Sequence, residues 1–167
     1  MAVTNDIIRT WRRPRRVMRD LLDQGKREDR AIAYLMISCL LIFVAQWPRL
    51  RRTAEGFEPS TWPSDVNFEG MLTYTFYGVV IILPLAMYGL AALSRLVAMP
   101  FGGNGSWYSA RLALFWTMLA TAPLTLLYGL VRGLIGPGIQ SSVLGAIWVI
   151  AFGFIWVQSL REAESRP

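Results

Sequence analysis

Residues 31–47 read AIAYLMISCLLIFVAQW, an apolar run that carries no charged side chain. Three more apolar runs follow, at about 71–98, 109–130 and 141–160, and their only charged residues are Arg95 and Arg111, each near an end of its run. A helix needs about 20 mainly apolar residues to cross a bilayer. The chain is therefore predicted to be all-α, a polytopic membrane helix bundle with four transmembrane helices, five being possible.

The apolar runs divide the chain into three parts. We expect a cytoplasmic basic amphipathic arm at 1–29, a transmembrane bundle at 30–160 with spans at about 30–47, 71–98, 109–130 and 141–160, and a cytoplasmic tail at 161–167. Pro48 should stop the first span, because proline offers no backbone N–H to a helix. Arg95 should reach from the end of the second span to the membrane surface, since a charge is costly in the hydrocarbon.

The arm is amphipathic over residues 4–27. At 100° per residue, one helix face collects apolar residues such as Ile7, Trp11 and Met18, and the opposite face collects arginines. This pattern predicts an interfacial helix in the headgroup plane, kinked or restarted at Pro14. Packing of the same apolar face on the bundle's own cytoplasmic side is an alternative of equal weight. The residues expected to contact anionic lipid headgroups are Arg12, Arg13, Arg16 and Arg19.

Basic residues concentrate in the arm. The chain has a formal net charge of +6, and nine of its 17 Lys and Arg residues lie in the first 30 positions. A basic segment beside a first span fixes topology and contacts anionic lipid. No nucleic-acid-binding motif accompanies it, so nucleic acid is not an expected partner. With four spans, 13 basic residues share the side of the termini and four lie on the other side, which predicts that both termini are cytoplasmic.

Residues that could carry chemistry are scarce. The chain has no histidine, and Cys39 is its only cysteine, so no metal site and no cofactor are predicted. The one candidate titratable pair is Asp65 and Glu69, in the loop after the first span, where solvated charges are the simpler interpretation. No catalytic residue is predicted, and we expect a protein that is not an enzyme.

Small residues predict how the helices pack. Gly129 and Gly133 form a GxxxG motif near the end of the third span, a spacing that lets two helix backbones approach closely. We favour packing within one chain over a homodimer seam. A homo-oligomer or a membrane protein partner stays open.

Three segments carry a resemblance to a known family: ALSRLV at 92–97, GGNGSW at 102–107 and APL at 122–124. They resemble the core of the Yip1 family, and the arm with Pro14 is similar to that of short bacterial members of alphaproteobacterial type. The resemblance implies a multi-pass protein of the bacterial inner membrane. Eukaryotic members have five spans and are linked to Rab GTPases and vesicle formation. The turn and helix motif of the family falls on Gly102, Gly103, Gly105, Ser106, Trp107 and Pro123.

The glycine segment itself predicts a tight chain reversal at the membrane surface, in preference to a phosphate-binding loop, because glycine adopts positive φ freely. For the whole chain, the leading hypothesis is a non-catalytic membrane protein that organises lipids or partner proteins. The alternative is a transporter or channel subunit, with helices kinked at Pro84 and Pro123 to free backbone carbonyls for a solute. The side chains that could line such a path are Ser38, Tyr77, Tyr88, Thr117, Thr121 and Thr125.

Overall fold

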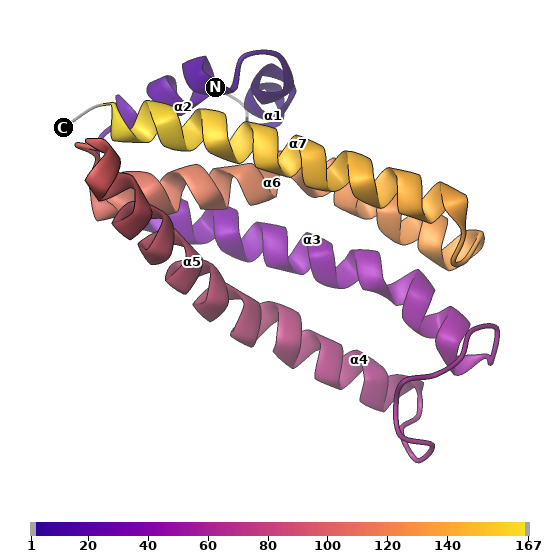
Figure 1. The fold of residues 1–167 in the computed structure, drawn as a ribbon. Helices are drawn as coiled ribbons and strands as arrows, with labels where there is room; N and C mark the ends of the chain where they lie inside the picture. Colours follow the sequence, from indigo (N-terminus) through magenta and orange to yellow (C-terminus); the bar gives the residue numbers. More distant parts are fainter. Residues whose placement is uncertain (1–2, 166–167) are drawn as a thin grey trace.

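The computed structural model describes residues 3–165, which are helical apart from short connections and contain no strand (Figure 1). Two short helices come first, followed by the long helices of a bundle. In chain order the α-helices are α1 (Val3–Arg12), α2 (Pro14–Leu22), α3 (Glu28–Ala54), α4 (Phe68–Phe76), α5 (Leu83–Ala98), α6 (Trp107–Leu134) and α7 (Ile139–Glu164).

Four helical segments within the described residues are long and apolar enough to cross a membrane: Glu28–Ala54, Phe68–Ala98, Trp107–Leu134 and Ile139–Glu164. Each contains one predicted span, so the predicted class, a polytopic all-α bundle, is confirmed. We call the end of the bundle where α3 and α6 begin the arm end. The opposite end, with the connections 55–67 and 135–138, is the loop end (Figure 1).

The prediction that Pro48 stops the first span is wrong, because α3 continues through it to Ala54. A proline inside a helix removes only its own N–H, and tertiary packing can compensate for that loss. Here Gly133 of α6 lies directly on the proline ring: a Cβ atom at Gly133 would be 2.0 Å from the Pro48 Cβ. A Cβ at Gly129 would likewise be 2.1 Å from the Ala45 carbonyl oxygen. The GxxxG motif therefore joins α6 to α3 within one chain.

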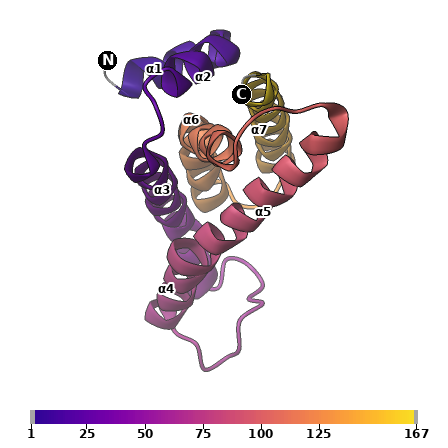
Figure 2. The same cartoon turned by 90° about the vertical axis from the view of Figure 1, so that its left-hand side faces the viewer.

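Helix α6 is the central helix of the bundle (Figure 2). Every residue from Leu112 to Ala122 is buried, because α3, α5, α7 and the first two helices surround this half of α6. Phe115 and Trp116 fill the core with edge-to-face ring contacts, Phe115 to Tyr88 and Trp116 to Tyr34, both with centroids 5.0 Å apart. A membrane-spanning helix is apolar on the sides that face protein and on the sides that face lipid, so the sequence does not mark α6 as the enclosed one.

The second span is not one regular helix. A π-helix, η1 (Tyr77–Ile82), connects α4 to α5 and stops just before Pro84. The wider π turn accommodates the proline, which has no N–H to give to the preceding turn. The combined segment lies beside α6 and α7 at the arm end and diverges from them toward the loop end (Figure 1). A short 3-10 turn, η2 (Met99–Phe101), follows α5.

Candidate functional site

The arm consists of α1 and α2, and the apolar face of α2 is buried in the protein. Val17, Met18 and Leu21 are 4% exposed or less and belong to the same hydrophobic cluster as Ala163 of α7. The arm lies along one side of the bundle, over α6 and α7 and away from α4 (Figure 2). The amphipathic pattern allowed either contact with lipid or packing on the bundle, and in the structure the arm packs on the bundle. The chain restarts at Pro14, the first residue of α2, as predicted.

Two indole hydrogen bonds hold α1 on α6. Trp116 Nε1 donates to Thr10 Oγ1 over 3.0 Å, where both side chains are buried. Trp11 Nε1 donates to the Ala120 carbonyl over 3.1 Å, in the helical turn before Pro123. Helix α6 stays continuous across Pro123. The carbonyl that Pro123 leaves without its helical donor is that of Leu119, which is next in the chain to the Ala120 carbonyl contacted by the arm.

The four predicted lipid-contact arginines have different environments. Arg19 Nε lies 2.8 Å from Glu162 Oε1 of α7, and this hydrogen bond raises the pKa of Arg19 above its ordinary value. The side chains of Arg12, Arg13 and Arg16 are exposed and have no hydrogen bond or ion pair with any described residue. The structure therefore separates one arginine that anchors the arm from three that face outward.

A basic groove runs between the arm and α7. It has a volume of about 550 Å³, and its walls bring four arginines next to one aromatic ring. Arg15 Nε donates to Gln158 Oε1 over 2.7 Å and joins the arm to α7 across the groove. The groove is lined by Arg13, Pro14, Arg15, Arg16, Arg19, Phe154 and Gln158. Such a lining combines cationic donors with an apolar surface, the chemistry that a lipid phosphate with its attached chain requires.

The glycine turn is a tight reversal at the arm end, as predicted. Gly102 has φ +79°, the left-handed region that favours glycine. Ser106 caps α6 through a reciprocal pair of hydrogen bonds with Ser109, which satisfies two backbone N–H groups at the helix start. Trp107, the next motif residue, is 49% exposed on the rim of the bundle.

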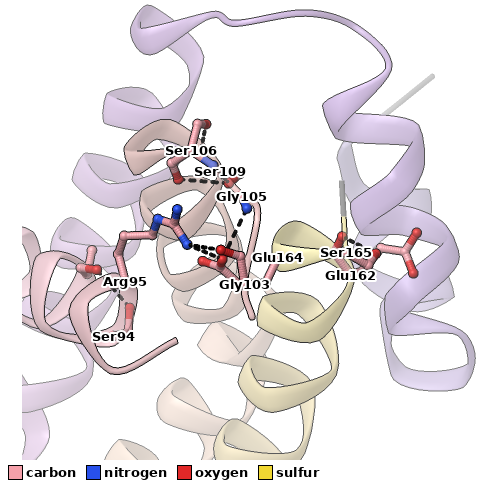
Figure 3. Close-up of polar contacts among 10 residues, drawn as sticks. Ser94, Arg95, Gly103, Gly105, Ser106, Ser109, Glu162, Glu164 and Ser165 are labelled. Atoms are coloured by element: carbon pink, nitrogen blue, oxygen red, sulfur yellow. Dashed lines mark hydrogen bonds and ion pairs between the residues drawn. The ribbon is translucent and has the colours of Figure 1, made fainter. Parts of the chain in front are cut away.

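Gly103 and Gly105 are small because a carboxylate lies against them (Figure 3). A Cβ at Gly103 would be 2.4 Å from Glu164 Oε2, and one at Gly105 would be 2.5 Å from the Ala163 carbonyl oxygen. The backbone N–H of Gly105 donates to Glu164 Oε2 over 3.2 Å, and the N–H of Asn104 donates to the Glu164 carbonyl over 2.9 Å. The family-like turn is therefore a receptor for the end of α7.

Arg95 completes this site from the second span (Figure 3). Its Nη1 donates to Glu164 Oε2 over 2.5 Å and to the Gly103 carbonyl over 3.1 Å, and both side chains are about nine-tenths buried. We expected Arg95 to reach the surface and the residues after Leu160 to form a tail. Instead α7 continues to Glu164. Glu162 and Glu164 are buried and form ion pairs with Arg19 and Arg95. An acid next to an apolar run carries no signal of burial, so sequence reasoning missed both.

Of the remaining sequence candidates, Thr121 and Thr125 are brought together in the lining of one cleft in the middle of the bundle. Asp65 and Glu69 are both exposed at the loop end. Ser38, Thr117 and Thr121 are buried, but each hydroxyl donates to a carbonyl of its own helix three or four residues earlier. Among the described residues, no group of three or more Cys, Asp or Glu side chains could hold a metal ion.

Four apolar crossings, an arm docked on their side and ion pairs at their rims define a multi-pass α-helical membrane protein. The chain belongs to the Yip1 domain family, because the family model matches residues 8–166. That match includes the docked arm as well as the glycine turn. Searches of curated proteins and of solved structures found no match.

Proposed function

We propose that this protein is a non-catalytic organiser of the bacterial inner membrane that gathers anionic lipids, and through them partner proteins, at its arm. Members of its family are generally non-enzymatic membrane proteins. Both termini lie in the cytoplasm in this proposal, since the positive-inside rule favours the side with the basic arm. The arm end then faces the anionic cytoplasmic surface of the bilayer.

The proposal rests on the two kinds of residue in the arm, those that pack on the bundle and the arginines that are exposed. Val17, Met18 and Leu21, apolar side chains of α2, are buried against the bundle, so they are not available for insertion into the membrane. The arm presents charge outward, in Arg12, Arg13 and Arg16, whose side chains have no partner among the described residues. Because Arg19 and the two indole hydrogen bonds fix the arm on the bundle, these cations are held in place beside the bilayer.

The test measures lipid enrichment around the full chain in vesicles of phosphatidylcholine and phosphatidylglycerol. We expect phosphatidylglycerol to be enriched, and Arg13→Gln with Arg16→Gln to reduce its binding. At about 1 kcal/mol per arginine, two substitutions correspond to roughly 30-fold at low salt. Added salt should weaken the enrichment in the native chain, because exposed charges are screened.

The matched control removes two arginines at the loop end, Arg49→Gln with Arg51→Gln, which changes the net charge equally. This control should keep the enrichment if the arm is responsible. Equal enrichment in the arm variant and the native chain, or enrichment that salt does not alter, would refute the proposal.

A further inference from the structure

A cleft of about 490 Å³ lies in the middle of the bundle, away from the arm. Residues of α3, α5, α6 and α7 line it. Figure 1 shows that α5 diverges from α7 toward the loop end. The volume falls within the range of about 300–1,000 Å³ that is typical of small-molecule sites. Its apolar lining includes Ile42 of α3, Leu83 and Met87 of α5, Met118 of α6 and Phe152 of α7.

We infer that this cleft binds one acyl chain of a membrane lipid from the leaflet on the side of the loop end. The cleft is bordered by spanning helices, so the molecules that reach its side opening are those of the hydrocarbon layer. Three polar side chains of the lining already have hydrogen-bond partners within the protein. Thr121 donates to the Thr117 carbonyl, and Trp148 Nε1 donates to Thr125 Oγ1 over 2.8 Å. An apolar chain therefore leaves none of these three side chains unpaired.

The length of the cleft matches one leaflet. Along α6 it extends from Met118 to Tyr128, which at 1.5 Å per residue is about 15 Å. The hydrocarbon core of a bilayer is about 30 Å thick, so one leaflet's chains cover about 15 Å. The cleft thus has the depth of a single acyl chain and ends near the bilayer centre.

Two polar side chains stand where the chain would join its headgroup. Gln46 and Tyr128 lie at the loop-end limit of the cleft, and neither side chain has a hydrogen bond with a described residue. Each is about one helical turn inward from an arginine of the rim, Arg49 in α3 and Arg132 in α6. The ester carbonyls of a lipid lie just below its headgroup, so Gln46 and Tyr128 are placed to donate to them.

The experiment uses the full chain in vesicles of phosphatidylcholine doped with phosphatidylcholine that carries a diazirine in the middle of one acyl chain. After illumination, mass spectrometry locates the adducts. We expect adducts on α6 between Met118 and Tyr128. Met118 is 7% exposed and Thr121 is 1% exposed, so neither residue lies on the outer surface of the bundle. A lipid chain that labels them must therefore have entered the cleft that they line.

Two variants fill the cleft, and each has a matched control on α7. Gly145→Phe places a ring in the cleft, where the first added atom meets Tyr128 at an ordinary 3.4 Å, and Gly153→Phe places the same ring in open space. Val149→Trp acts from an exposed wall, and Ile150→Trp is its exposed neighbour outside the cleft. The α6 adducts should be lost in Gly145→Phe and Val149→Trp and retained in both controls.

Equal α6 labelling in all four variants would overturn the inference. So would a disulfide between two copies of Val149→Cys in the same vesicles, because it would assign the cleft to a second chain. The probe lipid is zwitterionic, so its labelling should survive Arg13→Gln with Arg16→Gln. The inference and the proposed function can therefore fail independently.

Discussion

At the residue scale, the glycine turn is explained by one carboxylate. Gly103 and Gly105 approach the end of α7 so closely that any side chain would displace it, and the displaced group is half of a buried ion pair. Removing one partner of a buried pair typically costs about 3–5 kcal/mol, because the other charge remains buried alone. Glycine at these positions thus preserves the contact between α5 and α7.

We predict that Gly103→Ala destabilises the protein mainly by displacing Glu164. The substitution should cost about 2–3 kcal/mol in the native chain, since it breaks the bonds of Oε2 to Arg95 and Gly105. In a Glu164→Ala background the same change should cost less than about 1 kcal/mol, which makes the two positions coupled. The measurement is the free energy of unfolding in detergent micelles.

Gly153→Ala is the control for this cycle, because Gly153 has no atom near its Cβ position. Alanine there should be neutral or stabilising by up to about 1 kcal/mol, as in any helix interior. Additive effects of Gly103→Ala and Glu164→Ala would show that the turn and the carboxylate do not act together.

At the element scale, the arm is a packed part of the bundle. Met18 is fully buried between α2 and the long helices, whereas Ile8 of α1 is 58% exposed. We predict that Met18→Ala releases the arm, since truncating a buried Met costs about 2–5 kcal/mol. Limited trypsin digestion in micelles should then cut faster at the arginines of α2.

The control for the arm is Ile8→Ala, which removes a similar apolar volume from an exposed position. It should leave the trypsin rate at the α2 arginines unchanged. A Met18→Ala protein that is cut no faster than the native chain would contradict docking of the arm through its apolar face.

The elements differ in how far the sequence predicts them. The four spans are predictable because apolar content over about 20 residues is a local property of the chain. The amphipathic pattern predicts that the arm has an apolar face, but periodicity does not say what covers that face. Burial of Glu164 depends on Gly105, which lies 59 residues earlier in the chain, and on Arg95 in another helix. The family resemblance pointed to the motif glycines. The reason that glycine is required there, the close approach of Glu164, is visible only in the folded structure.

At the scale of the whole molecule, ion pairs between separate segments of the chain lie at both rims. At the arm end Arg111 pairs with Glu28, joining α6 to α3, and at the loop end Glu58 lies 3.4 Å from both Arg52 and Arg132. Arginines that would otherwise face the hydrocarbon edge are thus neutralised by partners on other segments. Arg12, Arg13 and Arg16 of the arm differ from these rim arginines because they are exposed and form no ion pair with a described residue. They lie at the end of the bundle that we assign to the cytoplasm.

Orientation is the prediction at this scale. Ser64→Cys, in the exposed connection 55–67, should react with a membrane-impermeant maleimide added to intact spheroplasts. Thr4→Cys, exposed on α1, should react after the membrane is permeabilised. The native Cys39 is fully buried and supplies the unreactive background. Labelling of Thr4→Cys in intact spheroplasts would reverse the proposed topology.

The ion pair between Arg19 and Glu162 joins positions 143 residues apart in the chain. A ribosome adding about 5–20 residues per second needs roughly 7–30 s to travel that distance. Throughout that interval Arg19 has been synthesised and its carboxylate has not. Helix α2 therefore lacks its partner helix until the last span has been synthesised, and newly made protein should pass through a stage in which α2 is more sensitive to protease than in the finished protein.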